Sequence, residues 1–198
     1  YRGVVILLMI IIMFFEFFIE LKDNDFYAYF LDVGQGDSTL IRTPEGKYIL
    51  VDTGSGRESY EELNRYFPLG ENTIDLLIIS HFDKDHVGAL PLILQSFNVN
   101  GIAYNEEDPD FNPSWAAQMK GIKKVGTNED NRIGCCVVIN WTIPEIDIDK
   151  VESNELSLAF RLDYNQLNIF FGGDLPSSYE DKIAPEIGNV DILKVGHH

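Results

Sequence analysis

Short apolar runs separated by polar, glycine-containing loops extend through most of the chain, a pattern typical of β-strands joined by turns. Strands are predicted at residues 26–30, 38–41, 48–51, 75–79, 99–104, 135–140, 157–161, 167–171 and 190–195, and the alternating segment 143–149 predicts an edge strand. Longer segments with helical spacing predict helices at residues 59–66, 87–97, 115–120 and 177–184. This mixture predicts an α+β fold.

The segment from Gly3 to Ile19 consists almost entirely of Val, Ile, Leu, Met and Phe and is broken only by Glu16. Its apolar side chains favour membrane insertion by about 6 kcal/mol in sum, against less than about 3 kcal/mol for the one carboxylate. A membrane span is therefore predicted at residues 3–19, with a secretory signal peptide and a core helix as alternatives. Because Arg2 precedes this segment and acidic residues follow it, the main domain is expected to be extracytoplasmic. The chain then divides into a membrane segment with a short linker at residues 1–25 and one folded domain at residues 26–198.

The strand predicted at residues 75–79 leads directly into His81-Phe82-Asp83-Lys84-Asp85-His86, so four potential ligands crowd one loop. Two carboxylates about 4 Å apart without a counter-ion repel each other by about 4 kcal/mol at an effective dielectric of about 20. A bound cation removes that cost. Imidazole with carboxylate suits zinc, manganese or iron, and a pair of such ions can activate water and stabilise charge on a phosphoryl or acyl oxygen. The alternative is a solvated loop whose histidines cap the next helix.

Strands that end in a loop with a ligand-capable residue recur along the chain, at Asp37, Asp52, His81, Asp174 and His197. If these five strand ends meet at one edge of packed sheets, they assemble a metal site from distant parts of the sequence. For Asp37 and Asp52, a turn capped by the carboxylate is at least as good an interpretation.

The 198 residues, 45% of them hydrophobic, are enough for one well-packed domain. The net charge of −17 repels polyanions at long range, so a nucleic acid would have to be held locally by metal ions and a few basic side chains. The compact basic cluster of Lys120, Lys123 and Lys124 is small enough to be an ordinary solvated face. Cys135 and Cys136 are adjacent, so no ordinary structural disulfide is expected between them.

Several short motifs together resemble the metallo-β-lactamase superfamily. They are FLDVGQGDS at residues 30–38, VDTG at 51–54, SHFDKDHVG at 80–88, GD at 173–174 and GHH at 196–198. More narrowly, they are similar to the extracytoplasmic hydrolase domain at the C-terminal end of bacterial ComEC-type DNA-uptake (competence) proteins, from about residue 26 onward. The resemblance implies a four-layer αββα sandwich with two divalent metal ions, zinc or manganese, at the sheet edge. It also implies a cell-membrane protein, anchored through residues 3–19 and joined to a channel domain of the same parent chain.

The resemblance further implies a ligand set. It consists of His81 and Asp83 for one metal, Asp85 and His86 for the other, Asp174 as a bridge, and His197, with His198 as a nearby alternative, to complete the second site.

Two departures from the superfamily pattern change these expectations. Many members supply a further histidine before the bridging aspartate, whereas no histidine lies between His86 and His197. Asn154 lies roughly where that ligand would come from, which gives the first metal site more oxygen character and favours manganese over zinc. Relatives continue beyond His198, so the fold is expected to be incomplete at its C-terminal end.

These features predict a metal-dependent phosphodiesterase, in the DNA-uptake context a nuclease that degrades the strand that is not imported. Single-stranded DNA is the expected partner. Asp85 is expected to orient or deprotonate the attacking water, and the loop around Gln35, from Gly34 to Asp37, is expected to present backbone N–H groups to phosphate. Two alternatives stay open: a membrane-anchored hydrolase of a small ester, lactone or phosphodiester, and a metal-poor binding or scaffold module of a DNA transport channel.

Overall fold

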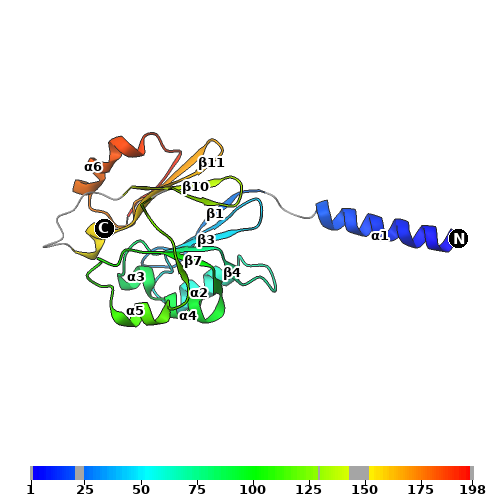
Figure 1. Cartoon of the computed structure of the whole chain (residues 1–198), viewed down its shortest axis with the longest axis horizontal. Coiled ribbons are helices and arrows are strands. Elements are labelled where there is room, and N and C mark those ends of the chain that lie inside the picture. The colour runs from blue at the N-terminus through cyan, green and yellow to red at the C-terminus, as the bar shows by residue number, and fades with distance from the viewer. Residues whose placement is uncertain (1, 21–24, 129, 143–151, 197–198) are drawn as a thin grey trace.

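The structure is a computed structural model that describes residues 2–20, 25–128, 130–142 and 152–196. Two β-sheets lie face to face, and helices cover the outer face of each sheet (Figure 1). The layers are therefore helices, sheet, sheet and helix, and the predicted α+β fold with its αββα architecture is confirmed.

The first sheet has the strand order β1-β2-β3-β5-β7-β8. Its strands are β1 (Tyr27–Phe30), β2 (Thr39–Arg42), β3 (Tyr48–Val51), β5 (Leu76–Ile78), β7 (Gly101–Ala103) and β8 (Lys123–Lys124). β1 to β3 form an antiparallel meander, and β3, β5, β7 and β8 are parallel neighbours. Because parallel strands need a crossover, the chain between them forms α2 (Arg57–Asn64), α4 (Leu90–Ser96) and α5 (Pro113–Gln118).

The second sheet has the strand order β13-β12-β11-β10-β9. Its strands are β9 (Asn131–Ile133), β10 (Val137–Thr142), β11 (Ala159–Tyr164), β12 (Leu167–Phe171) and β13 (Ile192–Lys194). The 3₁₀ helix η2 (Ser153–Leu156) precedes β11, and α6 (Ser177–Ile187) connects β12 to its parallel neighbour β13. A separate two-stranded parallel sheet joins β4 (Thr73–Ile74) and β6 (Asn98–Val99).

The central strands are buried on both faces. Leu50 and Leu77 pack in the hydrophobic cluster beneath the helices, whereas Ile49 and Ile78 pack in the cluster between the two sheets. All four side chains are fully buried. This two-sided burial explains why the sequence shows continuous apolar runs there and not a simple alternation.

Two predicted elements differ from the structure. The helix predicted at residues 87–97 is two helices, α3 (Lys84–Val87) and α4, because Pro91 fits the first turn of a new helix better than a helix interior. The strand predicted to be buried at residues 190–195 is β13, which lies at the sheet edge with Ile192 and Leu193 37% and 54% exposed. The edge strand predicted at residues 143–149 lies outside the described residues.

Residues 3–19, for which a membrane span is predicted, lie within helix α1 (Arg2–Glu20), which Figure 1 draws apart from the two sheets. The side chains from Val4 to Met13 are each more than half exposed. Within the part of the chain that the structure describes, no helix is long and apolar enough to cross a membrane, and the predicted span is not confirmed.

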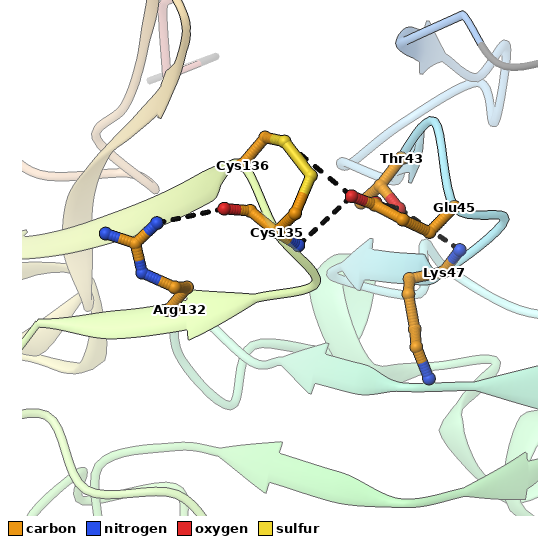
Figure 2. Close-up of a disulfide and its surroundings, with 6 residues drawn as sticks. All are labelled: Thr43, Glu45, Lys47, Arg132, Cys135 and Cys136. Atoms are coloured by element: carbon orange, nitrogen blue, oxygen red, sulfur yellow. Dashed lines mark hydrogen bonds between the residues drawn. A yellow bond between two sulfur atoms is a disulfide. The ribbon is translucent and has the colours of Figure 1, made fainter.

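The turn between β9 and β10 carries a disulfide between the adjacent residues Cys135 and Cys136 (Figure 2). The sequence predicts no ordinary structural disulfide between these cysteines because they are adjacent. The structure contains this disulfide, so the prediction is wrong. The bond forms where the chain reverses just after Gly134, and two contacts hold the reversal in place. The backbone N–H of Cys135 donates to Glu45 Oε1 at 3.0 Å, and Arg132 Nη1 donates to the Cys135 carbonyl oxygen at 3.0 Å.

Replacement of Phe160 tests the packing between the sheets. Its fully buried ring stacks on Phe171, with the ring centroids 4.8 Å apart. Phe160→Ala is expected to lower the free energy of unfolding by about 3–5 kcal/mol, measured by urea denaturation, because it leaves a cavity. Leu69 is fully exposed, so Leu69→Ala should change it by less than about 0.5 kcal/mol. Equal losses in the two variants would contradict this description of the core.

Candidate metal centre

The metal loop, residues 80–86, begins one residue after the end of β5 and ends in α3. Ile79, the residue after β5, donates its backbone N–H to the Ala103 carbonyl oxygen, which continues the sheet pairing. The chain then turns so that His81 and His86 both point inward, with 1% and 0% of their surface exposed. Their ring centroids lie 4.1 Å apart.

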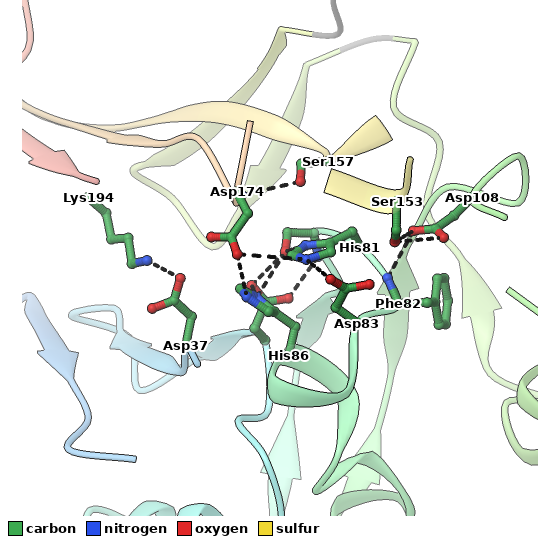
Figure 3. Close-up of polar contacts among 12 residues, drawn as sticks. Asp37, His81, Phe82, Asp83, His86, Asp108, Ser153, Ser157, Asp174 and Lys194 are labelled. Atoms are coloured by element: carbon green, nitrogen blue, oxygen red, sulfur yellow. Dashed lines mark hydrogen bonds and ion pairs between the residues drawn. The ribbon is translucent and has the colours of Figure 1, made fainter. Parts of the chain in front are cut away.

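Asp174 completes a buried cluster with these two histidines (Figure 3). It lies just beyond β12, so it reaches the metal loop from the other sheet. Its Oδ2 is 3.2 Å from His86 Nε2 and 3.9 Å from His81 Nε2. One ligand atom from each of the three residues lies within 4.8 Å of the others. The structure thus brings together His81, His86 and Asp174, three members of the predicted ligand set.

The chemistry of this cluster fits a divalent cation. Nε2 of His81 is buried and has no hydrogen-bond partner, which is costly for a polar atom unless a ligand satisfies it. Two imidazole nitrogens and a carboxylate oxygen are donors that zinc and other first-row divalent metals take in proteins. His81, His86 and Asp174 could therefore hold such an ion.

Asp52 and Ser80 fix the orientation of both rings. Asp52 accepts hydrogen bonds from the Ser80 backbone N–H at 2.8 Å and the Ser80 hydroxyl at 2.7 Å, and its Oδ2 lies 3.0 Å from His86 Nδ1. Because the Ser80 hydroxyl donates to Asp52, it can only accept from Nδ1 of His81, 3.0 Å away. Neutral His81 therefore carries its proton on Nδ1, and Nε2 keeps the lone pair that a metal ligand needs. Asp52 acts here as a positioning residue and not merely as a turn cap.

The two histidines have opposite pKa shifts. Burial opposes a charge on His86, but the carboxylates of Asp52 and Asp174 outweigh it and raise its pKa to about 10. Burial lowers the pKa of His81, and the positive charge of His86 lowers it further. In the metal-free protein, the proton on His86 balances the carboxylates that surround it.

The other predicted ligands lie outside this cluster. Asp83 is the N-cap residue of α3, with its side chain 31% exposed and Oδ2 3.7 Å from His81 Nε2. Asp85 is half-buried in α3, and Asn154 lies in η2 with a buried Oδ1 that has no hydrogen-bond partner. His197 and His198 lie outside the described residues.

The loop from Gly34 to Asp37 packs against the metal loop. Gly36 has φ +92°, and a Cβ atom there would lie 2.0 Å from the Asp85 carbonyl oxygen, so only glycine allows this contact. The Asp37 backbone N–H donates to that same oxygen at 3.3 Å, and the Asp37 side chain forms an ion pair with Lys194 (Figure 3). The sequence predicts that this loop presents backbone N–H groups to phosphate, but the Asp37 N–H is engaged within the protein and is not available for that role. Gln35 is exposed.

Asp108 is a further buried residue of the site, although its segment reads as an exposed acidic loop in the sequence. It is 2% exposed and accepts hydrogen bonds from three segments. Figure 3 shows two of the donors, the Phe82 backbone N–H at 2.9 Å and the Ser153 hydroxyl at 2.8 Å. The third donor is the Asp110 backbone N–H at 2.8 Å. In the sequence, the sign of this role is that Asp108 starts a turn before Pro109. Many solvated loops contain the same pair, so the sequence does not distinguish Asp108 from them.

Comparison with known proteins agrees with this geometry. Residues 31–190 match the metallo-beta-lactamase superfamily. The chain is 27% identical over 196 residues to ComE operon protein 3 of Bacillus subtilis and 30% identical over 186 residues to Recombination protein 2 of Haemophilus influenzae, and each alignment covers 85% of the chain. The chain spans only 25% and 21% of the length of these two relatives.

Two further similarities are more distant. The chain is 25% identical over 184 residues to Endoribonuclease YSH1 of Gibberella zeae, which covers 80% of this chain and 22% of the relative. Its fold is similar to the solved structure of the metallo-beta-lactamase fold protein YhfI from Bacillus subtilis, with a TM-score of 0.58 and 17% identity, over 87% of this chain and 68% of that one. The predicted resemblance to ComEC-type proteins is confirmed by the two relatives at 27% and 30% identity. Because the superfamily match covers residues 31–190, most of the chain, the protein belongs to the metallo-β-lactamase superfamily.

Proposed function

We propose that this superfamily hydrolase is a metal-dependent phosphodiesterase that cleaves single-stranded DNA, as part of DNA uptake. The observation that carries the proposal is the buried cluster of His81, His86 and Asp174, which gathers ligand atoms from both sheets within 4.8 Å. When bound there, divalent metal ions supply a Lewis acid for a phosphoryl oxygen and lower the pKa of a water molecule.

Particular side chains of this chain are proposed to bind the metal, orient the histidines and accept the proton. His81, His86 and Asp174 would hold the first ion, and Asp52 with Ser80 keeps the two imidazoles oriented for it. Asp85, one residue before His86 and half-buried, is the proposed acceptor of the proton of the attacking water. Asp85 and His197 are proposed to contribute to the second metal position.

Manganese is the proposed metal. Asp83 lies beside this cluster and would add a carboxylate oxygen where the common superfamily motif has a second histidine. Asn154 would add a carboxamide oxygen where many members have a third. More oxygen and less imidazole shifts the preference of a site from zinc toward manganese.

The choice of nucleic acid as substrate rests on the relatives. Endoribonuclease YSH1 and Recombination protein 2 are named for work on nucleic acids, whose backbone is a phosphodiester. Lys194 lines a small cavity together with Asp52 and Ser80, but the carboxylate of Asp37 already neutralises its charge. Because the net charge of −17 repels a polyanion at long range, a phosphate would be held by the metal ions themselves.

The net charge favours a second candidate, a hydrolase of a small ester, lactone or phosphodiester. A small substrate carries at most a few charges, so long-range repulsion costs it little. Oligonucleotide binding that weakens steeply with salt would argue against this candidate, because neutralising several phosphates releases counter-ions.

The Asp85→Ala variant tests the proposed nuclease. It is expected to lower manganese-dependent cleavage of a fluorescent single-stranded DNA oligonucleotide by a factor of about 10² or more, because the attacking water loses its proton acceptor. Glu58→Ala removes the same charge from an exposed position of α2 and should cleave at the wild-type rate. Undiminished cleavage by Asp85→Ala would contradict the assignment, and no cleavage by the wild-type protein would favour a small-substrate hydrolase or a scaffold module.

Metal binding is expected to release a proton from His86. At about pH 7.5 the metal-free protein keeps this ring protonated, since its pKa is about 10, whereas coordination needs the neutral ring. The affinity for Mn²⁺ should therefore rise by about tenfold per pH unit below pH 10. Titration calorimetry in two buffers of different ionisation enthalpy measures the proton count. An affinity that stays flat between about pH 6.5 and 8.5 would be incompatible with this proton on His86.

A further inference from the structure

The disulfide turn, residues 134–136 between β9 and β10, faces the turn between β2 and β3 (Figure 2). Glu45 in the β2–β3 turn makes the contact. Its Oε1 accepts the backbone N–H of Cys135 at 3.0 Å and lies 3.7 Å from Cys136 Sγ. Because β2 and β3 belong to the first sheet and β9 and β10 to the second, this contact joins the two sheets at their hairpin turns.

This contact and the metal centre lie at opposite ends of β3. The strand begins at Tyr48, directly after the β2–β3 turn, and ends at Val51. Asp52 follows and orients His86 of the metal cluster. The disulfide can therefore open or close without touching His81, His86 or Asp174.

A bond between adjacent cysteines contributes little to the stability of the whole fold. A disulfide stabilises a protein mainly by restricting the unfolded chain, and this effect grows with the number of residues that the bond encloses. Cys135 and Cys136 are neighbours, so the bond encloses almost no chain. It acts on the turn itself, where the Cys135 N–H is held toward Glu45 and the Cys135 carbonyl oxygen accepts from Arg132 Nη1 at 3.0 Å.

The two sulfur atoms differ in access and in local charge. Cys135 is exposed, whereas Cys136 is half-buried and lies beside the carboxylate of Glu45. The Thr43 hydroxyl donates to Glu45 Oε2 at 2.8 Å and lowers the pKa of Glu45, and the Cys135 backbone N–H also lowers it. The carboxylate is therefore charged at neutral pH and repels a thiolate that approaches Cys136.

Access and charge together determine how the bond reacts. Exposed disulfides exchange with thiols outside the protein, at a rate set by which sulfur is attacked and how readily the other leaves as a thiolate. The sulfur of Cys135 is the one open to attack, so the sulfur of Cys136 must leave. Because Glu45 lies beside the leaving sulfur, its negative charge disfavours the new thiolate and slows the reaction.

We propose that Cys135–Cys136 is a reversible exchange site for dithiol reductants, which Glu45 slows, and that the closed bond fastens the β9–β10 turn to the β2–β3 turn. One thiolate of the reductant attacks Cys135 Sγ and forms a mixed disulfide. The electron pair of the broken bond leaves on Cys136 Sγ, which takes a proton from solvent.

The second thiolate of the reductant then completes the exchange. It attacks the reductant's own sulfur in the mixed disulfide and releases Cys135, which also takes a proton. The cysteine pair gains two electrons and two protons, and the dithiol becomes a disulfide. Once the bond is open, the Cys135 N–H is no longer held toward Glu45, and both turns gain freedom. The proposal is independent of the proposed nuclease, and DNA cleavage is not used to test it.

Reduction of the full-length folded chain with dithiothreitol tests the exchange site. Alkylation followed by mass spectrometry is expected to find both cysteines as free thiols without denaturant, and oxidised dithiothreitol is expected to restore the bond. Hydrogen exchange of residues 43–47 and 131–137 should become faster by about threefold or more on reduction, because these segments lose their mutual contact. Exchange of the buried strand β5 should stay the same and serves as the internal control.

Glu45→Gln tests the part played by the carboxylate. Glutamine keeps an oxygen that accepts the Cys135 N–H but removes the charge beside Cys136. Reduction is therefore expected to be faster by about threefold or more at low salt. Glu58→Gln removes the same charge from an exposed position of α2 and should be reduced at the wild-type rate.

Three results would overturn the proposal. The first is a bond that is reduced only after the protein unfolds, or that does not form again. The second is equal exchange of both turns in the oxidised and reduced protein. The third is an equal rate of reduction in wild type, Glu45→Gln and Glu58→Gln. A double variant, Cys135→Ser with Cys136→Ser, should exchange like the reduced wild type at any dithiothreitol concentration. If its turns still respond to the reductant, the effect does not come from this bond and the proposal fails.

Discussion

The site depends on the burial of two imidazoles and a carboxylate at the place where the two sheets meet. His81, His86 and Asp174 are each at most 3% exposed, and polar groups in such a position are stable only when other groups satisfy them. Asp52 and Ser80 satisfy the Nδ1 side of both rings, which leaves the Nε2 atoms directed at Asp174. The remaining lone pair of His81 is the strongest indication that the cluster is built for a cation.

The αββα sandwich makes this burial possible because it brings two unrelated loop systems to one edge. The metal loop follows a central strand of the first sheet, and Asp174 follows β12 of the second. Close backbone packing then locks the loops together, most clearly at Gly36, where the chain leaves no room for a side chain beside Asp85. Asp108 adds a third connection, from the loop before α5 to the metal loop and to η2.

Much of this could be predicted from the sequence, because the relevant signals are local. The buried strand before the metal loop, the hairpin at residues 40–51 and the ligand spacing in the metal loop are all visible as short-range patterns. The role of Asp52 was open, because a carboxylate after a strand caps a turn as often as it orients a ligand. Asp108 was missed because its importance comes from contacts with Phe82 and Ser153, which lie far from it along the chain, and an acidic loop with prolines gives no sign of them. The exposure of β13 was also missed, since the hydrophobicity of a strand does not report which strands lie beside it.

The most direct measurement is a crystal structure of the protein with Mn²⁺, with anomalous diffraction used to locate the ion. We expect an anomalous peak within coordination distance of His86 Nε2 and of an Asp174 carboxylate oxygen, with His86 Nδ1 still bonded to Asp52. Saturating Mn²⁺ that leaves no anomalous peak between His81, His86 and Asp174, and leaves His86 bonded to both carboxylates, would contradict the account.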